Sequence, residues 1–201
     1  MRNLRLPATS LLVTLAVGAM PAAGQAEPPP HWYAEGKLVG SEPIPVKGKG
    51  GLGLSLSFSE FYGCNIRDRE SISNPTGGGA GIGEMLTVSI TACESGRMEE
   101  ICGVGFQAIP QDLPWHSHLV REASNEVVDV IEGAALEIRC KRKKRSLGVF
   151  SGMLFGSVTS SKWTLLFSEE RNILRKGSEH LYFSGGVVIR GRQGHKKISA
   201  A

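Results

Sequence analysis

Residues 52–58 read LGLSLSF, a strict alternation of large apolar residues with glycine and serine. Successive side chains of a β-strand point to opposite sides, so this alternation predicts a strand with one apolar face and one face of small residues. Residues 86–92, LTVSITA, repeat the pattern, and residues 136–140, LEIRC, place charged residues opposite the apolar face. Half-buried strands of this kind are typical of antiparallel sheets.

Further β-type segments, separated by glycine and serine, lie at residues 127–131, 147–158, 162–167 and 180–190. A short connection at residues 132–134 predicts a hairpin. Only residues 115–123 show a pattern compatible with one or two helical turns. Many short strands without alternating helices favour two packed sheets, so we predict an all-β fold, a Greek-key-like antiparallel β-sandwich stapled by two disulfides. This single β-rich extracellular domain is expected to span residues 27–201.

Residues 1–26 have the layout of a secretory signal peptide. Two early arginines precede an apolar run at residues 11–19, and small residues follow it. The run is shorter than the roughly 20 residues that cross a bilayer, so we predict cleavage after Gly24 or Ala26 rather than an uncleaved N-terminal anchor. No later segment is apolar for long enough, and we expect no membrane span in the mature chain. The predicted location is extracellular, either released or associated with the cell wall.

The chain contains four cysteines, Cys64, Cys93, Cys102 and Cys140. In an exported chain an even number predicts two disulfides, with three possible pairings. The strand alternation places Cys64 and Cys140 on apolar faces, whereas Cys93 and Cys102 flank a polar segment. We therefore predict the pairs Cys64–Cys140 and Cys93–Cys102, which leave no thiol as a nucleophile. The cysteines are too far apart in sequence for a typical zinc site.

Positive and negative residues are unevenly distributed along the chain. Residues 27–138 contain 7 Lys/Arg and 16 Asp/Glu, whereas residues 139–201 contain 14 and 3. Such segregation is typical of a surface that faces a polyanion. The alternative is that the two parts neutralise each other across neighbouring strands.

The densest basic stretch directly follows Cys140 and consists of Lys141, Arg142, Lys143, Lys144 and Arg145. Five adjacent cations repel one another, which predicts a solvated loop. We identify this loop as the candidate polyanion-binding site, whose affinity would fall as salt rises. The alternative is a charged loop that only keeps the end of a strand soluble.

Several other motifs lack the features that their chemistry needs. The glycine-rich residues 77–83 have no dinucleotide-binding register, and Glu84 stands where a phosphate-binding loop would have lysine. The pair His116 and His118 has no third metal ligand nearby. Aspartate is scarce, and no serine nucleophile motif is present. We therefore expect no cofactor and no metal, and we do not expect nucleic acid as a partner.

The order of several short motifs resembles a group of uncharacterised exported actinobacterial proteins. These motifs are HWY at residues 31–33, NPTGGGAG at 74–81, CES at 93–95, LPW at 113–115 and a strand that ends in Cys140. The resemblance implies export, a bacterial source and disulfide-bonded cysteines, and it implies no activity. The basic run at residues 141–145 departs from the pattern of the group.

Two functions remain in competition at this point. The first is a non-catalytic secreted module that associates with the cell envelope, with an anionic cell-wall polymer as its partner. The second is a secreted polysaccharide hydrolase, which needs two carboxylates that flank the scissile bond. The scarcity of aspartate and of catalytic motifs favours the first.

Overall fold

The computed structural model describes residues 27–56, 62–93, 102, 105–141, 144–159, 164–191 and 197–201. The predicted signal peptide, residues 1–26 with both predicted cleavage positions, lies outside these residues. The strands are β1 (Trp32–Ala34), β2 (Lys37–Leu38), β3 (Ile44–Ser55), β4 (Tyr62–Ser73), β5 (Ile82–Thr91), β6 (Phe106–Gln111), β7 (Trp115–Arg121), β8 (Val127–Cys140), β9 (Ser146–Thr159), β10 (Thr164–Phe167), β11 (Ile173–Lys176), β12 (Glu179–Gly191) and β13 (Ile198–Ala200). The all-β prediction is confirmed, and residues 115–121 form a strand where helical turns were considered.

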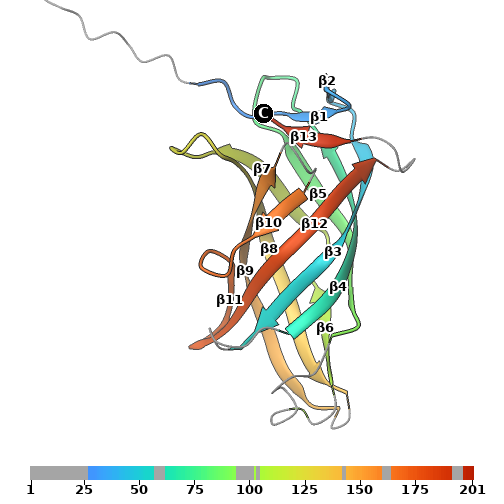
Figure 1. The fold of residues 1–201 in the computed structure, drawn as a ribbon, viewed down its shortest axis with the longest axis vertical. Coiled ribbons are helices and arrows are strands. Elements are labelled where there is room, and N and C mark those ends of the chain that lie inside the picture. Colours follow the sequence, from blue (N-terminus) through green and yellow to red (C-terminus); the bar gives the residue numbers. More distant parts are fainter. Residues whose placement is uncertain are drawn as a thin grey trace, which may run out of the picture.

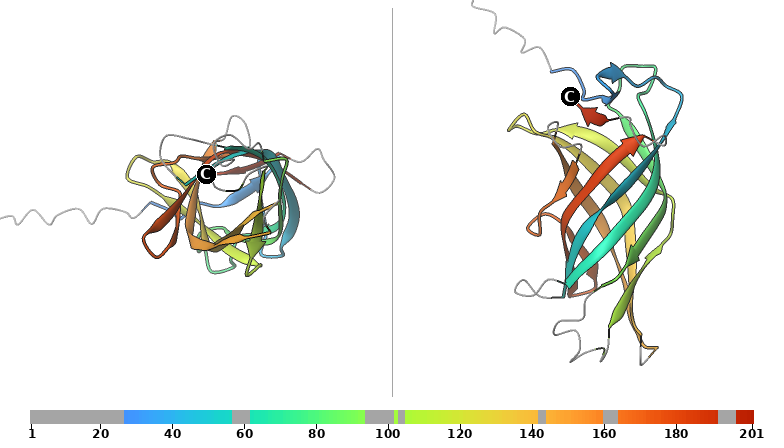
Figure 2. Two further views of the ribbon diagram at one scale, coloured as in Figure 1. Left: turned by 90° about the horizontal axis from the view of Figure 1, so that it is seen from below. Right: turned by 45° about the vertical axis from the view of Figure 1, so that its right-hand side comes forward.

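The main sheet closes on itself as an eight-stranded antiparallel barrel, so the predicted β-sandwich is wrong (Figures 1 and 2). Each long strand pairs with the next in sequence, and β12 returns to pair with β3 from Tyr182↔Ser55 to Gly191↔Val46. β6 and β7 together fill one position in the wall, because both pair with β8. β10 and β11 likewise share the position between β9 and β12. This up-and-down order also replaces the expected Greek-key connections.

Glycine makes the closure between β3 and β12 possible. A Cβ on Gly50 would overlap the carbonyl oxygen of Gly186, and Gly185 has a φ of 125°, which favours glycine. The two strands therefore approach closely where the sheet joins its own edge. The alternation of apolar and small residues is the same in a sandwich and in a barrel, and this is why the sequence pattern did not distinguish them.

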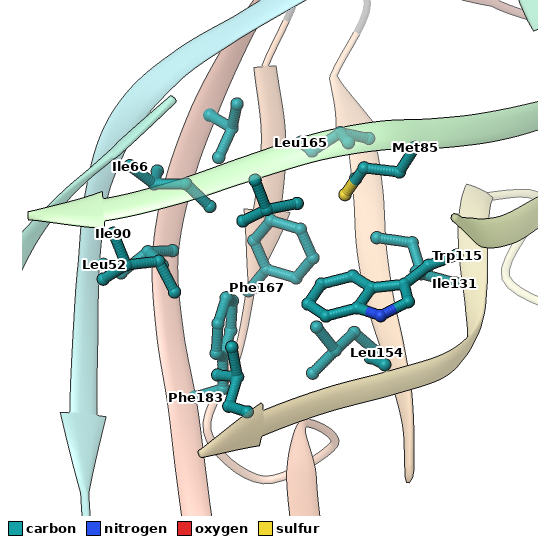
Figure 3. Close-up of a cluster of buried hydrophobic side chains, with 14 of the residues drawn as sticks. Leu52, Ile66, Met85, Ile90, Trp115, Ile131, Leu154, Leu165, Phe167 and Phe183 are labelled. Carbon is teal, nitrogen blue, oxygen red and sulfur yellow. The ribbon is translucent and has the colours of Figure 1, made fainter. Parts of the chain in front are cut away.

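Apolar side chains fill the middle of the barrel. Figure 3 shows residues from several strands converging there, among them Trp115, Met85, Phe167 and Phe183. The cavity left between them has a volume of about 20 Å³, room for a single water molecule. The barrel is therefore packed with side chains, as small eight-stranded barrels generally are.

A small sheet, β13-β1-β2, covers one end of the barrel, at the top of Figure 1. Asn74 attaches it: its Oδ1 accepts from the Trp32 N–H at 2.8 Å, and its Nδ2 donates to the Trp32 and Val39 carbonyls at 2.9 and 2.7 Å. Asn74 begins the glycine-rich loop, and the Gly81 N–H at the other end donates to the Pro30 carbonyl. The glycine-rich loop therefore anchors the cap on the barrel.

All four cysteines are in disulfides, but the predicted pairing is wrong. The bonds are Cys64–Cys93 and Cys102–Cys140. Cys64 and Cys140 do face the interior, as the alternation predicted, with 4% and 0% exposure. The alternation along a strand shows which side of the sheet a residue faces, but it does not show which strand lies next to it. Because β4 pairs with β5, and Cys140 lies opposite Phe106 of β6, each cysteine meets the one on the adjacent segment.

Tryptic digestion without reduction tests this pairing. Trypsin separates the four cysteines, since Arg97 lies between Cys93 and Cys102 and Arg139 immediately precedes Cys140. We expect one linked pair that joins the Cys64 and Cys93 peptides and one that joins the Cys102 and Cys140 peptides by mass spectrometry. A Cys93–Cys102 linked pair would contradict the structure.

Among the described residues, no helix is long and apolar enough to cross a membrane.

Candidate functional site: a basic groove outside and an acid cluster inside

Charged residues on β3 and β4 are sorted by the alternation of the strands. On β3, Val46 and Gly48 face inward and Lys47 and Lys49 face outward. On β4, Asp68 and Glu70 are buried, whereas the residues between and before them are exposed. Residues 67–70, RDRE, therefore place their two bases outside the barrel and their two acids inside it.

The pairing register brings the outer cations together in two rows. In the first row Lys47 lies opposite both Arg69 of β4 and Arg190 of β12. In the second row Lys49 lies opposite Arg67. Side chains directly opposite on adjacent strands have Cβ atoms about 5 Å apart. Five cations thus occupy one small area of the barrel wall.

These two rows line an open groove with a volume of about 1020 Å³. Asn65, Thr87 and Ser89 add polar groups to its walls. Gly51 continues the outward series of β3 without a side chain, so the groove extends along the strands past the second row. We call this surface, defined by Lys47, Lys49, Asn65, Arg67, Arg69, Thr87, Ser89 and Arg190, the basic groove.

The cations of the basic groove have no acidic partners among the residues that the structure describes. Within the described parts of the chain, none of the five makes an ion pair or a side-chain hydrogen bond. Like charges directly opposite each other destabilise a sheet. The acidic part of the sequence, residues 27–138, has only 7 Lys/Arg, and four of them lie here. Such concentration without compensation is the arrangement expected of an anion-binding surface.

The inward face of the same strands carries a second feature, the acid cluster of Asp68, Glu70, Ser117 and Asp129. Their exposures are 7%, 3%, 5% and 0%. Gly48 and Gly83 make room for them, because a Cβ on Gly48 would overlap the Asp68 carboxylate, and one on Gly83 would overlap Glu70 and Ser117. Gly81, immediately before β5, faces Trp32 of the cap, and Met85 of β5 faces the apolar core, so the cluster lies between the two.

Burial raises the pKa of all three carboxyl groups. It raises the pKa of Asp68 to about 6, against a hydrogen bond from the Gly48 N–H at 2.7 Å that lowers it. Burial raises the pKa of Asp129 to about 7; the nearby Ser117 hydroxyl, although not in hydrogen-bond geometry with it, lowers this pKa, and Asp68 raises it further. The pKa of Glu70 lies well above its ordinary value because of burial and the nearby Asp129 and Asp68. The cluster therefore retains protons up to neutral pH.

The acid cluster does not have the arrangement that a polysaccharide hydrolase needs. Glu70 Oε1 and both carboxylate oxygens of Asp129 are enclosed without a hydrogen-bond partner among the described residues. Glu70 and Asp129 are enclosed beneath the strands, out of reach of a polymer on the outer surface, and this leaves Asp68 as the one member of the cluster that also lines the basic groove. In the described ranges no group of three or more His, Cys, Asp or Glu side chains, the acid cluster included, is arranged to hold a metal ion. We therefore interpret the cluster as a structural, proton-holding feature.

The predicted basic loop lies elsewhere, at the end of the β8–β9 hairpin and far from the cap (Figure 1). Lys141, Lys144 and Arg145 are exposed, and residues 142 and 143 lie outside the described residues. Lys141 and Lys144 line a smaller hollow of about 370 Å³ with Gln107 and Arg139. The loop remains a predicted polyanion site.

Sequence reasoning missed the basic groove, although the alternation of bases and acids at residues 67–70 was a signal for it.

Comparisons with known proteins assign no family to this chain. No protein-family model, no curated protein and no solved structure matches it. Function is therefore inferred from the chemistry of the basic groove and the acid cluster.

Proposed function

We propose that the protein is a non-catalytic extracellular module that binds an anionic polymer of the cell envelope in its basic groove. One observation carries the proposal: five cations stand in register on three adjacent strands, and none of them makes an ion pair among the residues that the structure describes. A polymer with repeated negative charges would replace the mutual repulsion of these cations with attraction. Its displaced counterions would add a favourable entropy, which is the usual source of polyanion affinity.

The disulfides support the extracellular part of the proposal. Disulfides persist in oxidising compartments and are rare in the cytosol. Both bonds join neighbouring segments of the barrel wall, so they reinforce the sheet from which the groove is built. The predicted signal peptide and the resemblance to exported actinobacterial proteins agree with this setting.

Binding to cell walls tests the proposal. The oxidised mature protein is mixed with purified bacterial walls, and the bound fraction is measured at about 50 mM and about 500 mM salt. We expect retention at low salt that is lost at high salt. A titration should give a slope of log K against log salt of about −3.5, because about five cations contact a flexible polyanion. Retention at neither salt concentration would overturn the proposal.

Paired variants separate the groove from the loop. The double substitution Lys47→Ser/Lys49→Ser should weaken the retention and reduce the magnitude of the salt slope by about 1.4, because two cations are lost. The matched substitution Lys141→Ser/Lys144→Ser removes the same charge from the β8–β9 hairpin and should leave most of the retention. If only the Lys141→Ser/Lys144→Ser variant loses its retention, the polymer binds at the loop and not in the basic groove.

A further inference from the structure

We infer that the basic groove is matched to a phosphodiester polymer with a three-carbon repeat, that is, to poly(glycerol phosphate). This inference rests on the proposed function and adds the identity of the polymer. The evidence is the spacing of its two rows of cations and the kinds of side chain that form them. The spacing follows from the pairing register of β3, β4 and β12.

The groove covers parts of four adjacent strands, β12, β3, β4 and β5, and its two rows of cations follow each other along β3 and β4. The first row is Arg190–Lys47–Arg69, the second is Lys49–Arg67, and Gly51 and Asn65 lie at the next step along the same strands. An anion that faces a row therefore meets two or three cations at once. A polymer that follows the strands meets the rows in succession, at a distance of two residues, which is about 6.7 Å.

That spacing corresponds to a particular covalent repeat. Two residues of extended chain comprise six backbone bonds between the first and third Cα atoms. A glycerol phosphate unit also places six bonds between successive phosphorus atoms: P–O, O–C, two C–C, C–O and O–P. An extended six-bond repeat therefore spans about 7 Å, which sets one phosphate beside each row. A five-carbon repeat has eight bonds and moves the second phosphate past the row by about 2 Å.

The chemistry of the cations favours phosphate as the charged group. Arg67, Arg69 and Arg190 each present a planar fork of N–H donors, which suits phosphate oxygens, and two lysines add point charges. Thr87 and Ser89 on β5 supply hydroxyls beside the rows. The neutral strip at Gly51 and Asn65 leaves room for the uncharged carbons and hydroxyls of the polyol to pass.

Single-stranded nucleic acid also has six bonds between successive phosphorus atoms, but the composition of the groove disfavours its binding. Proteins that bind single strands stack the bases on aromatic side chains. No aromatic residue lines the groove in the part of the chain that the structure describes. The bases would therefore gain no platform, and an unsubstituted polyol chain is the better fit.

Synthetic oligomers test the repeat directly. Fluorescein-labelled hexaphosphates with 1,3-propanediol or 1,5-pentanediol spacers carry the same charge and differ only in spacing; a thymidine hexanucleotide and oligoglutamate complete the set. Fluorescence anisotropy at about 50 mM salt gives each Kd. We expect the three-carbon oligomer to bind about tenfold more tightly than the five-carbon one, the effect of one lost charge-assisted contact. The thymidine oligomer should bind no more tightly than the three-carbon one.

A row-deletion variant shows whether the spacing is read by the groove. Lys49→Gln/Arg67→Gln removes the second row, so both diol oligomers should then bind equally and weakly. The control Lys37→Gln/Arg175→Gln removes two exposed cations elsewhere and should keep the tenfold preference. Equal binding of all four oligomers to the unmodified protein would overturn the repeat and leave the proposed function intact. Tighter binding of the thymidine oligomer than of the three-carbon oligomer would also overturn the inferred repeat. If no oligomer binds, both the inferred repeat and the proposed function are overturned.

Discussion

Raising the pH from about 4 to about 8 should lower the free energy of unfolding by at least about 3 kcal/mol. The reason is the acid cluster, whose carboxyl groups have pKa values raised by burial inside the barrel. For Asp68 the shift from 3.8 to about 6 is a little over two pKa units, at about 1.4 kcal/mol for each unit. Urea denaturation at a series of pH values measures the effect.

The sign of the effect is opposite to that of a typical salt-bridged carboxylate. Between the unfolded pKa of 3.8 and the folded pKa of about 6 for Asp68 and about 7 for Asp129, the folded protein binds more protons than the unfolded chain. The contribution of these carboxyl groups to the free energy of unfolding is therefore complete at acid pH, and it is lost as the pH rises through this window. It levels off once Asp68 and Asp129 are ionised in both states, except for any further titration of Glu70.

A neutral substitute for one carboxyl isolates the cause. Asp129→Asn should raise the free energy of unfolding at pH about 8 and make the pH profile shallower, because a buried charge is no longer formed. Asp112→Asn is the matched control, since Asp112 is exposed between β6 and β7, and it should leave the profile unchanged. A barrel that becomes more stable between pH about 4 and about 7 would contradict this interpretation.

The double substitution Lys49→Glu/Arg69→Glu should lower the affinity for an anionic polymer by about 1000-fold and raise stability. Each new carboxylate lies opposite a remaining cation, Arg67 in one row and Lys47 in the other. The net charge of the groove changes by four, at about 1 kcal/mol for each charge near the polymer. Replacing like-charge pairs by opposite-charge pairs should add about 1 kcal/mol to the free energy of unfolding.

This opposition between binding and stability distinguishes a functional surface from an incidental one. Affinity is measured by fluorescence anisotropy and stability by urea denaturation of the same preparation. Lys37→Glu/Arg175→Glu, with the same charge change elsewhere, should lower the affinity far less. If the groove variant loses stability, or if both variants lose affinity equally, the cations act only through the net charge of the protein.

Local sequence patterns predicted several of the long strands and the faces of their residues, but the hairpin predicted at residues 132–134 is wrong, because residues 127–140 form the single strand β8. The alternation in residues 52–56 and 136–140 corresponds to strands with buried apolar residues, and Cys64 and Cys140 do face the interior. Alternation has no information about which strand lies beside which. The sandwich and the disulfide pairing both depend on neighbours that are distant in sequence, and both predictions were wrong for that reason.

The same limitation explains the missed site. The basic run at residues 141–145 is conspicuous because its charges are adjacent in sequence. The basic groove draws Lys47 and Lys49 from β3, two arginines from β4 and Arg190 from β12, and only the closure of the barrel places them together. The acid cluster likewise combines β4 with Ser117 of β7 and Asp129 of β8.

The most direct test of the central claim is a titration of the ¹⁵N-labelled, oxidised protein with the three-carbon phosphodiester oligomer, followed by amide chemical shifts. The basic groove predicts that the largest shifts fall at residues 47–51, 65–69, 87–89 and 188–191. They should vanish at high salt while the amides of the cap stay unchanged. Shifts confined to the β8–β9 hairpin around Lys141 and Lys144, or no shifts at all, would contradict binding in the groove.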